Sequence, residues 1–523
     1  MLSTGVRRSL KAAPQWARLG QRGARTQAWA GSGGPLAQAI PAVSVSGDTH
    51  QSQEGGFFSK LFGLKKSGPV ITPLFEPLPG LQTPSPVEFA SIPLETKITT
   101  LPNGMKIASE DTPGPTTTVG LYIDSGSVYE TAGNNGVSHL LERMSFKTTN
   151  NRTHFRLIRE VEAIGGNVQA SASREQMAYT GDALRTHMPE ILELLADSVR
   201  NPKFVEWEVK EQLARVKAEV SEMANNPQSL MVEALHSAGY AGALGRPLLC
   251  PESNVGRLDS AACREFVEAN YTAPRMVLAA SGVDHSDLLA VAEPLFSDLP
   301  KVALPPTPLT EYVGGDWRLA ADAPVTHVAL GFEFPGGWRN EKDAVAISVL
   351  QMLMGGGGSF SAGGPGKGMY SRLYTRVLNQ HGQVNSCTAF NSIYNSTGLF
   401  GIHGTAPSAF IASLVDIMCE EFLAVATPGG VTETELQRAK NATISHVLMN
   451  LESRVVTTED IGRQILTYGH RKPPAEFCSM VEALSADDIT AIAAKITKTP
   501  LSMASWGDVV HVPRFDQVAA RFA

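Results

Sequence analysis

From about residue 95 onward, apolar positions follow two periods, and segments of the two kinds alternate along the chain. In Val205–Met223 the apolar residues stand three or four positions apart, which places them on one stripe of a helix. The apolar run Thr117–Ser125 predicts a strand. Two runs, 96–101 and 105–109, flank Asn103-Gly104 and predict a hairpin with a tight turn. Further helices are predicted over residues 136–146, which Asn134-Asn135 can cap, and over 154–164 and 187–200.

This order of elements occurs twice. The stretch Val119–Glu130 resembles Val328–Arg339, and each is followed at similar spacing by an apolar helix. Residues 304–322 lie between the copies and are rich in Pro and Gly, a composition typical of linkers. We therefore expect an α+β protein with two related halves, residues 95–303 and 323–515, joined by that linker.

A glycine-rich stretch, Met354–Met369, interrupts the second half. Eight of its sixteen residues are glycine, so it should form neither a helix nor a strand. Helices are predicted on both sides, over 343–354 and 369–378. Loops of this length in a compact chain are usually functional or disordered, and a plain linker is the alternative reading. The predicted substrate-contacting residues are Gly355, Gly356, Gly357, Gly358, Ser359, Phe360, Ser361, Gly363, Gly364, Pro365, Gly366, Lys367 and Gly368.

The glycine-rich stretch does not match the known nucleotide-binding patterns. A phosphate-binding loop needs Ser or Thr after its lysine, and here Gly368 follows Lys367. The dinucleotide fingerprint fails in every register and would have to follow a strand. A nucleotide is therefore not an expected ligand. No nucleic-acid partner is expected either.

Composition narrows the cellular setting. The chain has 523 residues and is 43% hydrophobic, enough for two or more cores. Its five cysteines are widely spaced, without a Cys-x-x-Cys pair, which argues against a disulfide framework and fits a reducing compartment. No run of about eighteen apolar residues exists, so no transmembrane helix is expected.

The N-terminus is basic. Residues 1–33 contain six Lys and Arg side chains, and no acid precedes Asp48. This composition is typical of a mitochondrial transit peptide, with a basic arm that binds an anionic partner as the alternative. Residues 34–94 are expected to be a flexible leader. Removing the six positive charges would change the formal net charge from −7 to −13, which suits a basic partner or substrate.

The candidate chemistry lies in His139-Leu-Leu-Glu142-Arg143. Residues i, i+3 and i+4 share one face of a helix, and the inverted zinc motif His-x-x-Glu-His uses that face for two metal ligands and a general base. Arg143 stands at the second histidine position, and a guanidinium has no lone pair to offer zinc. The motif alone is also compatible with an ordinary surface helix.

A wider set of features resembles the pitrilysin-like metallopeptidases. The set comprises Asn134-Asn-Gly-Val-Ser-His-Leu-Leu-Glu142, the following Phe146-Lys-Thr-Thr149, Glu219 in Val216-Lys-Ala-Glu-Val220 and the two-fold repeat. The resemblance covers about residues 95–515. It implies that Glu219 matches the family's third ligand and that Arg143 replaces the second. We therefore expect no catalytic residue and no metal or other cofactor in this chain, and an ion pair between Arg143 and Glu219.

The glycine-rich stretch resembles that of a non-catalytic subunit in this family. The resemblance implies a heterodimer with a zinc-bearing catalytic beta subunit, which removes presequences from imported precursor proteins. The implied location is the mitochondrial matrix, with possible peripheral contact to the inner membrane. Alternatives are a structural core subunit of the respiratory bc1 complex and an independently active peptidase. Glu420 and Glu421 could meet basic substrate residues, but a solvated helix face is the expected role.

Overall fold

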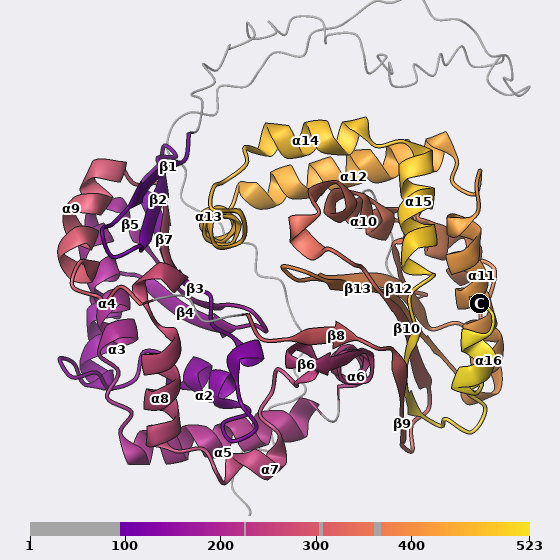
Figure 1. The fold of residues 1–523 in the computed structure, drawn as a ribbon, viewed down its shortest axis with the longest axis horizontal. Helices are drawn as coiled ribbons and strands as arrows, with labels where there is room; N and C mark the ends of the chain where they lie inside the picture. The colour runs from indigo at the N-terminus through magenta and orange to yellow at the C-terminus, as the bar shows by residue number, and fades with distance from the viewer. Residues whose placement is uncertain (1–94, 224–225, 303–306, 360–367) are drawn as a thin grey trace, which may run out of the picture. The chain divides into compact units, whose positions relative to one another are not determined.

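The protein is represented by a computed structural model that describes residues 95–223, 226–302, 307–359 and 368–523. The predicted transit peptide and leader lie outside these residues. The described residues belong to one compact unit, in which sheets and helices alternate as an α+β fold (Figure 1). The predicted fold class is confirmed. Within the described ranges, no helix is long and apolar enough to span a bilayer.

The first half is built around a six-stranded sheet in the order β1-β2-β7-β3-β5-β4. Its strands are β1 (Lys97–Thr100), β2 (Lys106–Glu110), β3 (Thr116–Ile123), β4 (Asn167–Ala172), β5 (Met177–Leu184) and β7 (Met276–Ser281). Its helices are α2 (Val137–Met144), α3 (His154–Ala163), α4 (Met188–Arg200), α5 (Glu206–Met223), α6 (Pro227–Gly239), α7 (Glu252–Val255), α8 (Ser260–Asn270) and α9 (His285–Phe296). The predicted hairpin and the helices agree with these bounds to within a few residues.

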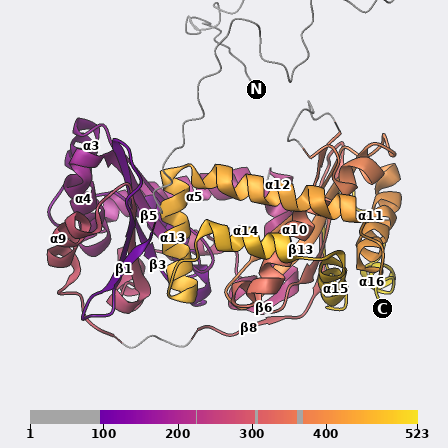
Figure 2. The same cartoon turned by 90° about the horizontal axis from the view of Figure 1, so that it is seen from above.

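The second half is built around another six-stranded sheet, in the order β11-β12-β13-β10-β14-β9. Its strands are β9 (Gly315–Ala320), β10 (Thr326–Glu333), β11 (Gly356–Gly358), β12 (Ser386–Ile393), β13 (Gly398–Ala406) and β14 (Ser502–Gly507). Its helices are α10 (Glu341–Met354), α11 (Ile411–Ala426), α12 (Glu433–Leu451), α13 (Arg454–Tyr468), α14 (Pro474–Ala483), α15 (Ala486–Ile496) and α16 (Phe515–Ala519). Figure 2 shows α12 and α14 side by side, in agreement with their contacts.

The topology confirms the repeat read from the sequence. In the first sheet, β4, β5, β3 and β7 pair antiparallel in that order, and β7 then pairs parallel with β2. In the second sheet, β12, β13, β10 and β14 pair antiparallel, and β14 pairs parallel with β9. Five strands therefore correspond in order and direction. Each sheet has one further strand. In the first sheet β1 pairs with β2, and in the second sheet β11 pairs with β12, at the opposite end of the five.

The two halves exchange helices. Helix α6 of the first half packs against β10, β14 and β9 of the second sheet, whereas α13 of the second half packs against β3 and β7 of the first (Figure 1). Gly462 of α13 lies directly against the ring of the buried Tyr122, where a Cβ atom would stand 2.2 Å from a ring carbon. Each half thus supplies part of the apolar cover that the other sheet requires.

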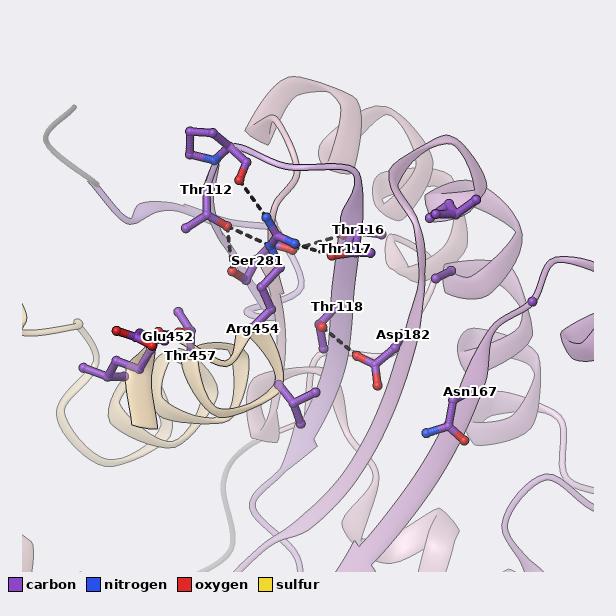
Figure 3. A pocket seen from close by; sticks show the side chains of 16 residues that line it. Thr112, Thr116, Thr117, Thr118, Asn167, Asp182, Ser281, Glu452, Arg454 and Thr457 are labelled. Carbon is purple, nitrogen blue, oxygen red and sulfur yellow. Dashed lines mark hydrogen bonds between the residues drawn. The ribbon is translucent and has the colours of Figure 1, made fainter. Parts of the chain in front are cut away.

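Arg454, the first residue of α13, fixes this helix to the first sheet. Its guanidinium donates to Thr112 Oγ1 at 3.2 Å, to the carbonyl of Pro113 at 2.8 Å and to Thr116 Oγ1. These contacts lie in a pocket of about 820 Å³ whose lining includes several threonine side chains (Figure 3). Because three donor nitrogens of Arg454 are occupied, the residue connects the halves and offers little to an anionic ligand.

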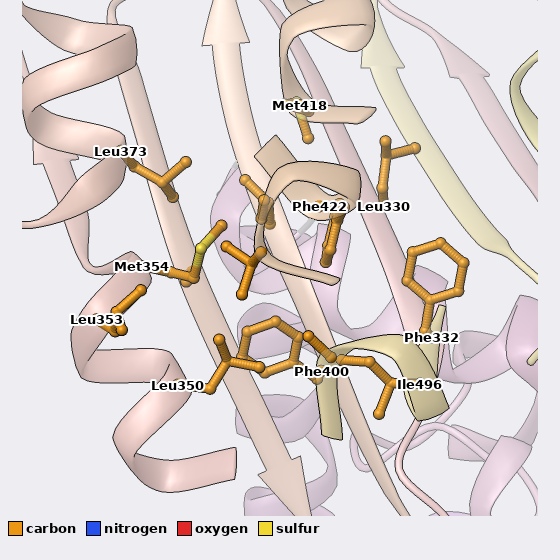
Figure 4. Packing of buried hydrophobic residues seen from close by; sticks show 14 of the residues in the cluster. Leu330, Phe332, Leu350, Leu353, Met354, Leu373, Phe400, Met418, Phe422 and Ile496 are labelled. Atoms are coloured by element: carbon orange, nitrogen blue, oxygen red, sulfur yellow. The ribbon is translucent and has the colours of Figure 1, made fainter. Parts of the chain in front are cut away.

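A separate apolar core lies under each sheet. In the second half, Leu350, Leu353 and Met354 of α10 face a core that also contains Phe332 and Phe422, whose ring centroids are 5.2 Å apart (Figure 4). Burial of a Leu or Phe side chain contributes roughly 1.5–3 kcal/mol. Helix α10 therefore holds the chain in place just before the glycine-rich stretch begins.

Two strands lie within the predicted linker, residues 304–322. Residues Thr310–Tyr312 form β8, which pairs with β6 (Tyr240–Gly242), and β9 extends the second sheet. The sequence did not indicate these strands, because the Pro and Gly content is typical of a linker, β8 is only three residues long and β9 begins at a glycine. Part of this connection is thus integrated into the fold.

The expectation that the glycine-rich stretch forms no strand is wrong for its beginning. Gly356–Gly358 form β11, which pairs antiparallel with Ser386–Thr388 of β12. Strand pairing requires only backbone groups, which glycine supplies. Gly355 and Gly356 have φ values of +57° and +102°, conformations that turn the chain from α10 into the sheet edge. After the stretch, the predicted helix over 369–378 contains π-helical hydrogen bonding at Tyr374–Leu378.

We predict that Gly356→Ala destabilises the protein much more than Gly357→Ala does. A Cβ atom at Gly356 would stand 2.0 Å from the carbonyl oxygen of Cys387, whereas nothing lies within 4 Å of one at Gly357. The strained backbone should lower the free energy of unfolding by about 1–3 kcal/mol or more at Gly356, against about 0.5 kcal/mol at Gly357. Urea unfolding of both variants measures this, and equal losses would contradict the tight turn at Gly356.

Candidate functional site: a carboxylate shared by histidine and arginine

The first turn of α2 is held by a carboxylate from outside the helix. Glu130 accepts hydrogen bonds from the backbone N–H groups of Gly136 (2.7 Å) and Ser138 (2.8 Å). A negative charge at a helix N-terminus is favourable, although burial raises the pKa of Glu130. Asn134, expected as the cap, instead accepts from the N–H of Thr131 at 2.6 Å. Glu130 was missed because a carboxylate seven residues before the first helical residue fits no cap pattern.

Helix α2 places His139 and Arg143 against Glu219 of α5. His139 Nε2 lies 3.1 Å and Arg143 Nε 2.8 Å from the same oxygen, Glu219 Oε2. The other oxygen, Glu219 Oε1, lies 3.5 Å from Arg215 Nε. The predicted ion pair between Arg143 and Glu219 is therefore confirmed. It joins α2 to α5, two helices that are distant in sequence.

The hydrogen bonds of His139 assign its protonation state. The backbone N–H of Cys250 donates to His139 Nδ1 at 3.3 Å, so the ring proton lies on Nε2 and is donated to Glu219. The ring is buried, and burial lowers its pKa although Glu219 acts in the opposite direction. His139 is thus a neutral imidazole with both nitrogens engaged.

Glu142 occupies the position of the general base in the zinc motif but is bound to other groups. Its Oε2 accepts the backbone N–H of Ala172, at the end of β4, at 2.9 Å. Its Oε1 lies 3.3 Å from Arg143 Nη2. Glu142 therefore connects α2 to the edge strand of the first sheet and adds a second negative group beside the guanidinium.

These residues do not fit the zinc ion that the inverted zinc motif would hold in a peptidase of the resembled family. Two N–H donors, from His139 and Arg143, converge on the Glu219 oxygen that would bind a metal. Arg143 also keeps a fixed positive charge within 3 Å of that oxygen. Across the described residues, no group of three His, Cys, Asp or Glu side chains is arranged to hold a metal ion. The arrangement holds helices together and has no free base or nucleophile.

The glycine-rich stretch is described only at its two ends. Gly355–Ser359 and Gly368 are among the described residues, whereas the other predicted contacts, from Phe360 to Lys367, lie outside them. Ser371 Oγ accepts the N–H of Gly356 at 3.1 Å, so the chain after the stretch returns to its beginning. The two ends are thus fixed near each other at the edge of the second sheet.

A charged cluster that sequence reasoning missed lies directly after the stretch. Arg376 lies 3.9 Å from Glu421 of α11 and 3.7 Å from Glu435 of α12, and the fully buried Arg372 lies 3.5 Å from Glu435. Burial raises the pKa of Glu421. The expected solvated face is therefore wrong for Glu421, while Glu420 is exposed. Only the four-residue spacing of the two arginines hinted at this cluster, and that spacing is also common on exposed helices.

Comparison with known proteins gives consistent matches over most of the chain. Residues 106–252 match the insulinase model of peptidase family M16, and residues 257–443 match the model of the M16 inactive domain. The mitochondrial-processing peptidase subunit alpha of Solanum tuberosum is 57% identical over 483 residues, covering 92% of this chain and 95% of the relative. The human subunit alpha is 35% identical, covering 85% and 88%.

A solved structure shares the fold at lower identity. A chain of complex III2 from Candida albicans, with Inz-5 bound, superposes with a TM-score of 0.70 over 82% of this chain and 99% of that one. The sequence identity is 19%, so this match concerns the fold alone.

We predict that Arg143→Met lowers the free energy of unfolding by about 1–2 kcal/mol. Loss of one partner leaves the half-buried Glu219 less compensated, which costs more than an exposed pair and less than a fully buried one. The matched control is Arg156→Met, which removes an exposed pair with Glu160 and should cost about 0.5 kcal/mol or less. Chemical denaturation of both variants measures the difference, and equal losses would refute a linking role for Arg143.

Proposed function

Since the chain belongs to peptidase family M16, we propose that it is the non-catalytic, substrate-recognising subunit of a heterodimeric peptidase that removes presequences from imported mitochondrial precursors. Its partner would be a beta subunit of the same family, which holds the zinc ion and performs the cleavage. The names of the relatives at 57% and 35% identity support this function. They also support a mitochondrial location, which we refine to the matrix, with peripheral contact to the inner membrane.

The observation that carries the proposal is the altered motif. In this chain, Arg143 and His139 both donate to Glu219, so the arrangement that would activate a water molecule in a zinc peptidase is replaced by an ion pair. Catalysis therefore has to come from another chain, and the match to the M16 inactive domain agrees with this view. What remains for this subunit is to bind the substrate.

The glycine-rich stretch suits that role. Presequences are cationic and vary in sequence, so a rigid pocket of side chains would accept only a few. A stretch dominated by glycine can offer backbone N–H and C=O groups to many sequences, with Phe360 as an apolar contact. Glycine has more backbone freedom than other residues, so fixing a glycine-rich sequence around a substrate costs entropy, which limits affinity and favours release.

A second candidate function is that of a structural core subunit of respiratory complex III. The fold match to a complex III2 chain favours it, but at 19% identity it carries less weight than relatives at 57%. Affinity purification of the tagged chain from mitochondria distinguishes the two. A zinc-containing peptidase partner supports the proposal, and recovery only with haem-containing membrane subunits supports the alternative.

We predict that replacing residues 360–367 by a short Gly-Ser linker leaves the fold and the partner contact intact but impairs substrate handling. The ends of the stretch are held together through Gly356 and Ser371, so the core should not change. Precursor binding and turnover by the reconstituted pair should both fall. Thermal melting, a pull-down with the partner and a precursor-cleavage assay measure the three properties.

An equal-length Ser-Gly replacement is the control for length, and Phe360→Ala should give a milder defect. Normal precursor binding by the shortened variant would mean that the stretch is only a linker.

A further inference from the structure

A cavity of about 700 Å³ lies where the two halves meet. The turn Ser173–Gln176, between β4 and β5 of the first half, forms one wall. Helices α10, α12, α13 and α14 of the second half, with the end of β12 and the turn that follows it, form most of the others. Gln351 and Met352, which precede the glycine-rich stretch by a few residues, also line it. The volume lies within the range of ordinary ligand sites.

The charged side chains that line this cavity are almost all neutralised by a partner. Arg174 forms a two-bond pair with Glu233 at 2.8 and 2.9 Å, and Arg463 lies 2.6 Å from Glu459. Asp460 lies 3.2 Å from Arg471, which also pairs with the buried Glu110, and it accepts a hydrogen bond from Gln464. Lys472 pairs with Glu341. These pairs leave little net charge on most of the lining.

Glu175 is the exception among the acids, and the lining also includes the imidazole of His446, on α12. Its two oxygens lie 3.1 and 3.0 Å from the backbone N–H of Asn395, which is a neutral donor. Within the described part of the chain, no basic side chain forms an ion pair with it. A carboxylate accepts up to four hydrogen bonds, so Glu175 retains capacity for a further donor. It stands on the cavity wall as an acid without a cation.

The surroundings of Glu175 disfavour its ionised form. Burial raises its pKa to about 7, and the backbone bond from Asn395 does not restore the ordinary value. Asp124 raises the pKa further, whereas Arg339 lowers it. A positively charged ligand would relieve both the desolvation and the repulsion from Asp124, so the site should favour cations.

The rest of the lining is suited to an apolar group. Trp338, Ile393, Phe477 and Met480 contribute large apolar side chains. A ligand with a cationic end and an apolar body matches both parts of the wall. Arginine and lysine side chains, with their alkyl stems, have this form.

We propose that this cavity receives an arginine or lysine side chain of a bound peptide, with Glu175 accepting the cationic group and the apolar wall covering the alkyl stem and a neighbouring apolar residue. The proposal rests on the presequence-binding function proposed above and gives Glu175 a part in substrate specificity. The position beside Gln351 and Met352 places the site next to the root of the glycine-rich stretch, where such a peptide would pass.

The experiment measures binding of a fluorescein-labelled amphipathic peptide with several arginines to the full chain, at pH 6 and pH 8. A matched peptide carries citrulline, the neutral analogue, at each arginine position, and free argininamide competes in a separate arm. The variants are Glu175→Gln and Ser348→Phe, which fills the cavity from α10 without removing a carboxylate. Glu476→Gln, an exposed acid on α14, is the matched control.

At pH 8, Glu175 is ionised, and Glu175→Gln should weaken arginine-peptide binding roughly 10- to 100-fold, as expected for loss of a charged hydrogen bond. Wild-type binding should weaken from pH 8 to pH 6 as Glu175 takes up its proton, and the variant should lose this dependence. Ser348→Phe should also weaken binding, while Glu476→Gln should not. The citrulline peptide should bind the wild type and Glu175→Gln equally weakly.

Unchanged binding of the arginine peptide to both Glu175→Gln and Ser348→Phe would overturn the proposal, and so would an absence of binding to the wild type. Tight competition by argininamide would mean that the cavity serves a free amine and would overturn the peptide assignment.

Precursor cleavage by the reconstituted pair distinguishes failure of the proposed function from failure of the cavity proposal. If the wild-type chain does not support cleavage, the proposed function fails. If it does, and Glu175→Gln leaves KM unchanged, only the cavity proposal fails.

Discussion

One carboxylate, Glu219, determines how α2 and α5 meet. It accepts N–H groups from His139 and Arg143 on one oxygen and lies near Arg215 on the other. In a zinc peptidase of this family a metal would join these helices, and here a guanidinium does so. Desolvation offsets much of the attraction in such a pair, so its main effect is to fix geometry. The first half can therefore keep the shape of a peptidase domain without its chemistry.

That shape matters because the halves depend on each other. Helices α6 and α13 each cover the other half's sheet, and Arg454 fixes α13 to the first sheet. The same junction encloses the cavity with Glu175, and one of its walls, α10, leads directly into β11. The junction between the two halves thus positions the first half, the start of the glycine-rich stretch and the proposed cation site together.

Much of this fold was predictable from the sequence, because burial patterns are strong over long segments. The stripe over Val205–Met223, the hairpin around Asn103-Gly104 and the repeat of β3 in β10 were all found in this way. The ion pair of Arg143 with Glu219 followed from a family resemblance, since the two residues are 76 positions apart.

Features that depend on backbone geometry or on distant contacts could not be predicted. Gly356–Gly358 pair as a strand although glycine disfavours strands, because β12 offers free backbone groups at the sheet edge. Glu130 replaces the expected cap from outside the helix. Glu175 has no distinguishing sequence pattern, and its importance arises only where the two halves meet.

The most direct test of the central claim is the zinc content of the purified chain compared with its Arg143→His variant. The account predicts well below one zinc per wild-type chain and about one per variant chain, because the substitution supplies the missing imidazole beside His139 and Glu219. About one tightly held zinc in the wild type would contradict it.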